Sequence, residues 1–312
     1  MSLDFSPKFG SSPTFTPQIV DGIVRTLGQR DGQASFALLT ELMSAEPDNL
    51  RNDLRSGTDF GFWNFAPDGM VKLRINLDFD EGKWTPYSLA RFLHTSLLES
   101  PKGNLNDQEN WNSLTGLMAW SFSLKISSPK DGVIEVVRIG DNKEFEDIGR
   151  KTGLSEGLVM NQTQMPAARR WLKAFNVSMS IGKEVVIFPA IVSEAAGLIF
   201  DSMENLADIS AKDFAIQIRK LCPFLPGGQF GKKWTELSTS HIPSTSSGLI
   251  DMASDFTFSQ MESLALATFA SKGIITYEHK NDAPDGYQIT AGSNSGKLIT
   301  LIKKNRKIDV SR

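Results

Sequence analysis

The side chains best suited to catalysis are few in this chain and far apart. There are three histidines (His94, His241 and His279) and one cysteine, Cys222, among 312 residues. A metal centre, or a nucleophile activated by histidine, needs several such groups together. The acidic run at 78–81 has no further ligands at the spacing of a calcium-binding loop. We therefore predict no catalytic residue, no metal site, no cofactor and no enzymatic activity. An enzyme with an unfamiliar carboxylate site stays open as an alternative.

Three glycine-containing segments match known motifs only in part. The segment 227–233 has Lys233 where a phosphate-binding loop needs a hydroxyl, and 292–298 leads into a predicted strand instead of a helix. The segment 153–157 has the glycine–serine spacing of a nucleophile elbow, but a polar, helix-like stretch precedes it where a strand is required. We expect the segment 227–233 to end a helix and 292–298 to form an exposed turn. The match at 153–157 is expected to arise by chance.

The clearest charged pattern is a basic amphipathic helix at 166–177. Trp171 and Phe175 fall on its apolar stripe, and its basic residues gather on the other side. This short segment resembles a helix of nucleoproteins from segmented negative-strand RNA viruses, although Asn176 replaces the usual glycine. The resemblance implies a surface that follows a sugar-phosphate backbone, with an aromatic ring for stacking on bases. The predicted nucleic-acid-binding residues are Arg169, Arg170, Lys173, Arg219, Lys220, Lys232, Lys233 and Trp234.

The two ends of the chain differ in character from its body. Phenylalanines in a Ser-, Pro- and Gly-rich setting near the N-terminus suggest an arm that packs against a neighbouring subunit. The C-terminal end runs from an apolar stretch into a basic tail at 303–307. The predicted oligomerisation residues are Phe5, Phe9, Phe15, Leu298, Ile299, Leu301 and Ile302.

A second segment resembles a different class of protein. The stretch from Phe145 to Val159 is similar to the helix-turn-helix of bacterial regulators, with Gly153 in the turn. The helix and hairpin expected at 256–290 could likewise form a winged helix. This alternative predicts a closed dimer that binds duplex DNA in a sequence-specific way.

Composition limits the choice of partner and compartment. The net charge is −3, with 16 basic and 22 acidic residues in 1–160 against 17 and 14 in 161–312. This balance is less basic than that of typical DNA-binding domains. No apolar run approaches the roughly 18 residues of a membrane span, so we predict no membrane insertion. The N-terminus has no secretion signal. We expect the protein in a virion or in host cytoplasm.

Periodicity predicts a mainly α fold with minor β hairpins (α+β), built as a helical core with extended N- and C-terminal arms. Expected helices cover 18–29, 34–44, 86–99, 111–125, 143–152, 166–175, 184–202, 211–221 and 256–270. Expected strands cover 60–65, 70–79, 133–139, 274–279, 287–290 and 298–302. The predicted domains are an N-terminal arm (1–17), an N-terminal lobe (18–160), a helical lobe (161–236), a linker (237–250), a helix with hairpin (251–296) and a basic C-terminal arm (297–312).

These observations favour a self-assembling structural protein that encapsidates nucleic acid, similar to a viral nucleocapsid or coat protein. Its predicted partners are further copies of itself, joined through the terminal arms, and single-stranded RNA bound without sequence specificity. The alternatives are the helix-turn-helix regulator and an enzyme with an unrecognised site.

Overall fold

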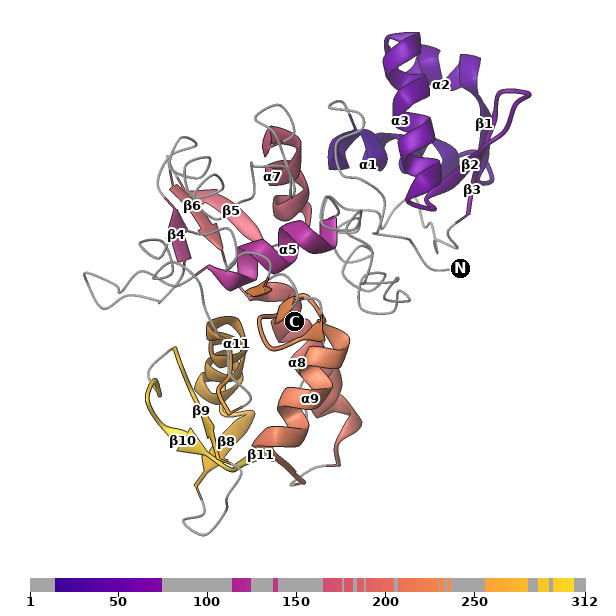
Figure 1. Ribbon diagram of the computed structural model, residues 1–312. Coiled ribbons are helices and arrows are strands. Elements are labelled where there is room, and N and C mark those ends of the chain that lie inside the picture. Colours follow the sequence, from indigo (N-terminus) through magenta and orange to yellow (C-terminus); the bar gives the residue numbers. More distant parts are fainter. Residues whose placement is uncertain are drawn as a thin grey trace. The chain divides into compact units, whose positions relative to one another are not determined.

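The chain forms two compact units (Figure 1). Unit 1 is drawn from Met1–Leu117 and Ser155–Phe175, and unit 2 from Met118–Leu154 and Asn176–Arg312. Both combine helices with small antiparallel sheets, which confirms the mainly α, mixed α+β fold. The computed structural model describes residues 15–74, 114–124, 137–139, 165–175, 177–181, 184–187, 189–204, 207–229, 231–232, 235–236, 256–279, 286–291 and 294–305.

Unit 1 begins with three helices and three short strands in close succession. The strands form one antiparallel sheet in the order β1-β3-β2, so the last strand lies in the middle. A tight turn at 66–69 joins β2 to β3, and Gly69 adopts a left-handed φ of 82° in it. The elements are α1 (Pro17–Gly28), β1 (Gln33–Ser35), α2 (Phe36–Met43), α3 (Pro47–Asp59), β2 (Trp63–Phe65) and β3 (Met70–Leu73), followed much later in the chain by α7 (Met165–Ala174).

Side-chain caps fix the starts of these three helices. The hydroxyls of Thr16 and Ser35 accept N–H bonds from the first turns of α1 and α2. The carboxylate of Glu46 does the same for α3, accepting from Asn49 N at 2.9 Å. Each cap satisfies a backbone donor that the helix itself leaves unpaired. Ser44 ends α2 in the left-handed conformation, so that only three residues, 44–46, separate α2 from α3.

Aromatic rings fill the core of unit 1. The Phe15 ring lies 5.5 Å from that of Phe60 and 5.4 Å from that of Trp171, which α7 contributes. The Trp171 indole N–H donates to Phe15 O at 3.2 Å. On the other side of the core, the buried Trp63 donates to Leu54 O of α3 at 2.8 Å. These contacts hold α3 firmly against its sheet by one face.

Unit 2 contains three small antiparallel sheets, ordered β4-β6-β5, β7-β11-β8 and β10-β9. Helices α8 and α11 pack against each other, as do α8 and α9. Helix α5 (Leu114–Ser123) crosses the boundary between the units in sequence. The other elements are β4 (Val137–Ile139), β5 (Ser178–Ile181), β6 (Glu184–Ile187), α8 (Ala190–Ser202), β7 (Asp208–Ser210), α9 (Ala211–Leu221), α11 (Gln260–Ser271), β8 (Ile275–Glu278), β9 (Tyr287–Gln288), β10 (Leu298–Ile299) and β11 (Leu301–Lys304).

Several predicted elements are confirmed, and others are wrong in an informative way. The helix at 211–221 and the turn at 66–69 occur as expected. The predicted helix at 184–202 is instead a strand, β6, followed by a helix that starts at Ala190. The β-branched run 185–187 pairs with β4 and β5, and Pro189 caps α8. The strand at 275–278 pairs with β11 and not with β9, because β11 closes the sheet from far along the chain.

Candidate nucleic-acid interface

The first part of unit 1 has the layout of a winged helix-turn-helix. Helices α2 and α3 are joined by the three-residue turn at 44–46, which is the spacing of a helix-turn-helix. The β2–β3 hairpin follows α3 directly and supplies a short wing at 66–69. In Figure 1 these elements form the indigo part of the chain, with α1 to α3 gathered around β1 to β3. In such proteins the second helix of the pair enters the major groove of DNA.

Helix α3 is two-sided. Its inward residues, Leu50, Asp53, Leu54, Ser56 and Gly57, are buried against the rest of unit 1. Its outward residues are polar or charged. At 100° per residue, Arg55, Asp48 and Asp59 lie nearest the middle of that face, and Arg51 and Asn52 lie about 50° to either side of it. The exposed residues of α3 are Pro47, Asp48, Asn49, Arg51, Asn52, Arg55 and Asp59.

The residue types on this face are those that read bases. Arginine pairs with the major-groove edge of guanine, and asparagine with that of adenine. Arg55 forms no ion pair or hydrogen bond with any residue that the structure describes, so its guanidinium is available to a ligand. The exposed face of α3 is therefore chemically suited to contact with DNA.

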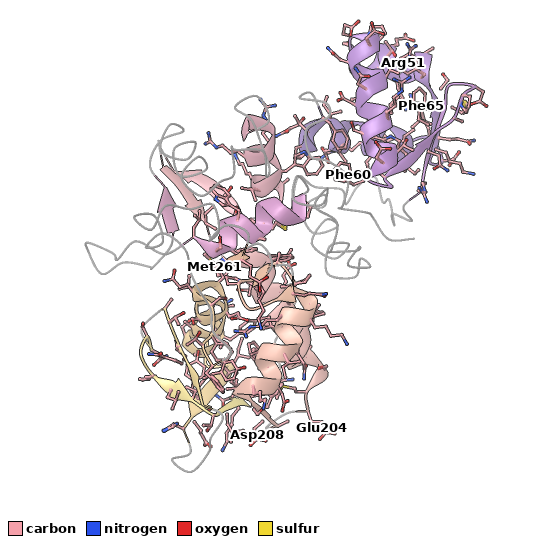
Figure 2. The ribbon with its side chains drawn as sticks, viewed as in Figure 1. Arg51, Phe60, Phe65, Glu204, Asp208 and Met261 are labelled. Carbon is pink, nitrogen blue, oxygen red and sulfur yellow. The ribbon has the colours of Figure 1, made fainter. Side chains whose placement is uncertain are left out.

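A groove separates α3 from the wing. Figure 2 labels two of the residues that line it, Arg51 on α3 and Phe65 on β2. The ring of Phe36 stacks on that of Phe65 at 5.8 Å, and the Arg51 guanidinium lies over the Phe36 ring at 5.1 Å. Arg51 Nη1 is 3.7 Å from a carboxylate oxygen of Asp48. The groove has a volume of about 530 Å³ and is lined by Phe36, Arg51, Arg55, Thr58, Asp59, Phe65, Ala66, Pro67 and Gly69.

Unit 2 contains a second version of this layout, and there the corresponding helix is not presented to solvent. Helices α8, α9 and α11 accompany a sheet ordered β7-β11-β8, which repeats the first-last-middle order of unit 1. Half of the residues of α11 are buried, and only Thr268 and Ser271 are exposed. Residues 222–259 are inserted between α9 and α11. Of the two layouts, the one in unit 1 offers its helix to a ligand.

The predicted basic surface is divided between the units. On α7, in unit 1, Arg170 and Lys173 are exposed and Arg169 is half-buried. In unit 2, Lys220 and Lys232 are exposed. Lys233 and Trp234 lie outside the described residues.

Arg219, also predicted to bind nucleic acid, is used inside unit 2. Its guanidinium donates to both carboxylate oxygens of Glu262, at 2.8 and 3.1 Å, and to Thr257 O at 2.7 Å. The side chains of Arg219 and Glu262 are 9% and 0% exposed. Glu262 also accepts from Ser259 N at the start of α11. The pair joins α9 to α11 inside the unit.

The residues predicted for oligomerisation have mixed environments. Phe15 is buried in unit 1, while Phe5 and Phe9 lie outside the described residues. In unit 2, Ile299 and Ile302 are buried, Leu301 is half-buried and Leu298 is 44% exposed. Leu301 and Ile302 belong to β11, the central strand of its sheet.

Among the described residues, the two groups with a clearly shifted pKa, Tyr277 and Lys303, lie in unit 2, away from α3 in sequence. Burial raises the pKa of Tyr277, whose hydroxyl has no hydrogen-bond partner among the described residues. A hydrogen bond to Glu278, at 2.6 Å, raises the pKa of Lys303. Within the described part of the chain, no cluster of His, Cys, Asp and Glu could hold a metal ion. No described helix is long and apolar enough for a membrane span.

Sequence reasoning missed α3, the helix that carries this site. The helix-turn-helix expected at 145–159 lies outside the described residues. The turn and second helix of unit 1 are at 44–59 instead. The available signals were the acidic cap Glu46, Pro47 at the first helical position and Asp48 in the first turn.

A model of the DpdG-like family matches residues 13–283 of the chain. The match includes all of the elements from α1 to β3, and in unit 2 it extends through β8. No curated protein and no solved structure matches the chain.

Proposed function

The chain belongs to the DpdG-like family, and we propose that it is a duplex-DNA-binding component of a DNA modification system. In this proposal the winged helix of unit 1 holds the DNA, with the exposed face of α3 in the major groove.

The family overturns the function predicted from the sequence. It is associated with DNA modification (Dpd) systems, so the prediction of a viral nucleocapsid or coat protein is wrong. That prediction rested on the similarity of one short amphipathic helix to a helix of viral nucleoproteins. A dozen residues with this basic and aromatic pattern occur by chance in many folds. A regulator built on residues 145–159 has no support from the family either. Self-association through the two ends stays a prediction.

The observation that carries the proposal is the outward face of α3. Its inward face is fixed by the buried Leu50 and Leu54 and by the bond from Trp63 to the backbone of the helix. Its outward face offers Asn52 and Arg55, both exposed, where a docked duplex would present base edges. A helix fixed by its inward face, with Asn52 and Arg55 exposed on its outward face, needs little reordering to bind.

The small exposed surface of α11 supports separate roles for the two units. Only two residues of α11 are exposed, against seven of α3, so α11 offers few side chains to the major groove. We therefore place DNA contact in unit 1 and give the second layout a structural role.

Binding to duplex DNA, followed by fluorescence anisotropy over a range of salt concentrations, tests the proposal. The double variant Asn52→Ala/Arg55→Ala should weaken binding by about 30-fold or more, since each of the two base contacts contributes about 1–3 kcal/mol. The matched control is Arg170→Ala/Lys173→Ala, which removes two exposed cations from α7 in the same unit. Its affinity should stay close to that of the wild type. Single-stranded RNA serves as the competitor and should displace the duplex poorly.

Two outcomes would overturn the proposal. A wild-type chain that binds no duplex, or prefers single-stranded RNA, does not have this function. The second outcome is that the α7 variant no longer binds duplex DNA while the α3 variant still binds it. That result would show that the predicted basic helix, and not the winged helix, carries the site.

A further inference from the structure

The two arginines of the groove are held in different ways. Arg55 has no ion-pair partner among the described residues, whereas Arg51 lies against the ring of Phe36 with its Cζ atom 5.1 Å from the centroid. The Arg51 side chain is still 47% exposed. An aromatic face under a guanidinium fixes its position and leaves the N–H groups at its edge free to donate.

We propose that Arg51 binds a backbone phosphate of the DNA duplex and that Phe36 is its positioning residue. This inference rests on the proposed function and assigns separate roles along one helix. Arg55 and Asn52 face the bases, and Arg51, on the side of the helix that lines the groove, holds the DNA strand that passes between α3 and the wing.

The contacts of Arg51 leave it available for a phosphate. The nearest carboxylate oxygen, on Asp48, is 3.7 Å from Nη1, which is beyond hydrogen-bond distance. Asp48 is also 83% exposed, so solvent screens the attraction between them. A phosphate can accept two parallel N–H bonds from the guanidinium and replace this weak pair.

The charges along the groove place the phosphate at one end. Asp59, the acidic residue among those that line the groove, is two helical turns beyond Arg51, a separation of about 12 Å along the helix axis. Arg55 lies between them. A phosphate beside Arg51 is therefore close to two cations and far from the groove carboxylate. The aromatic pair of Phe36 and Phe65 keeps this wall rigid.

Salt-dependent binding to duplexes of different sequence separates this role from base contact. Arg51→Ala should weaken binding to all duplexes by a similar factor and lower the slope of log affinity against log salt by about 0.9, the value for one phosphate. Arg55→Ala, the comparison variant, should weaken binding unequally between sequences.

A double-mutant cycle tests the role of Phe36. Phe36→Leu should weaken DNA binding by about two- to fivefold, the range of an exposed cation–ring contact, with Arg51 present. In the Arg51→Ala background the same change should have no further effect. Phe256→Leu is the control, because this exposed phenylalanine belongs to unit 2 and does not line the groove. Thermal unfolding of each variant identifies any loss of fold, and the cycle compares only variants that remain folded.

An unchanged salt slope in Arg51→Ala, or additive effects of Phe36→Leu and Arg51→Ala, would overturn the inference. Both results are measured against a wild-type chain that binds duplex DNA. Failure of the wild type to bind would instead remove the proposed function itself.

Discussion

Replacing Arg219 by methionine should destabilise unit 2 strongly. Methionine keeps much of the length of the side chain and removes its charge. The carboxylate of Glu262 would then be 0% exposed without the guanidinium that now donates to both its oxygens. Removing one partner of a buried ion pair costs about 3–5 kcal/mol, because the remaining charge is left uncompensated. For a unit of this size the melting temperature should fall by about 10 °C.

Differential scanning calorimetry of the full chain measures this effect, and the chain offers a matched control. The pair of Lys303 and Glu278 is 39% and 41% exposed, with an N–O distance of 2.6 Å. Lys303→Met should leave the melting temperature almost unchanged, since solvent screens an exposed pair. Similar distances and very different burial make the two variants a direct test of burial.

The double variant Arg219→Met/Glu262→Met tests whether the lost stability comes from the buried charge of Glu262. If it does, removing that carboxylate as well should recover part of the lost stability. Recovery will be incomplete, because Glu262 also accepts from Ser259 N and a lost helix cap costs about 1 kcal/mol. A double variant that is less stable than Arg219→Met, or an Arg219→Met variant as stable as Lys303→Met, would refute this account.

Three further predictions concern unit 1. Gly57→Ala should lower stability by about 1–3 kcal/mol or more, because a Cβ there would lie 2.0 Å from the Trp63 ring; an unchanged urea midpoint would contradict this. Phe15→Ala should cost about 3–5 kcal/mol, because the ring is buried beside Trp171, and a chain as resistant to urea as the wild type would show that Phe15 is dispensable to the core. Asp59→Asn should tighten duplex binding by about two- to fivefold, because it removes a carboxylate from the groove, and weaker binding in anisotropy would place the DNA elsewhere.

Helices with regular apolar spacing could be predicted from the sequence. The buried positions of α1, Val20, Ile23, Val24 and Leu27, recur at helical intervals and identify it without a structure. The wing was also predictable, because a Pro-Asp-Gly turn follows one strand and precedes an alternating one. Helix α9 was found for the same reason as α1.

Helix α3 could not be found in this way, because its buried face is not apolar. Three of its five buried positions are Asp53, Ser56 and Gly57, so a search for apolar periodicity finds only Leu50 and Leu54. Gly57 lowers helix propensity, yet it is required where the Trp63 ring passes close to the backbone. The sequence pattern of α3, the helix that carries the candidate site, is therefore typical of a polar loop.

The role of Arg219, a charged residue, could not be predicted from the sequence either. In the sequence it adjoins Lys220 at the end of a helix, where both suggest a basic surface. Its acidic partner, Glu262, is 43 residues away, and only folding brings the two together.

The sequence by itself determined the mixed α+β class, the amphipathic helices and the turns, because these depend on neighbours within a few residues. The tertiary structure decided what the charged and polar residues do. It paired Arg219 with Glu262, laid Arg51 over Phe36, left only two residues of α11 exposed and left the polar face of α3 exposed. The role of each of these residues depends on which side chains distant in sequence come into contact and which helix faces remain exposed to water. The local spacing of residues predicts neither.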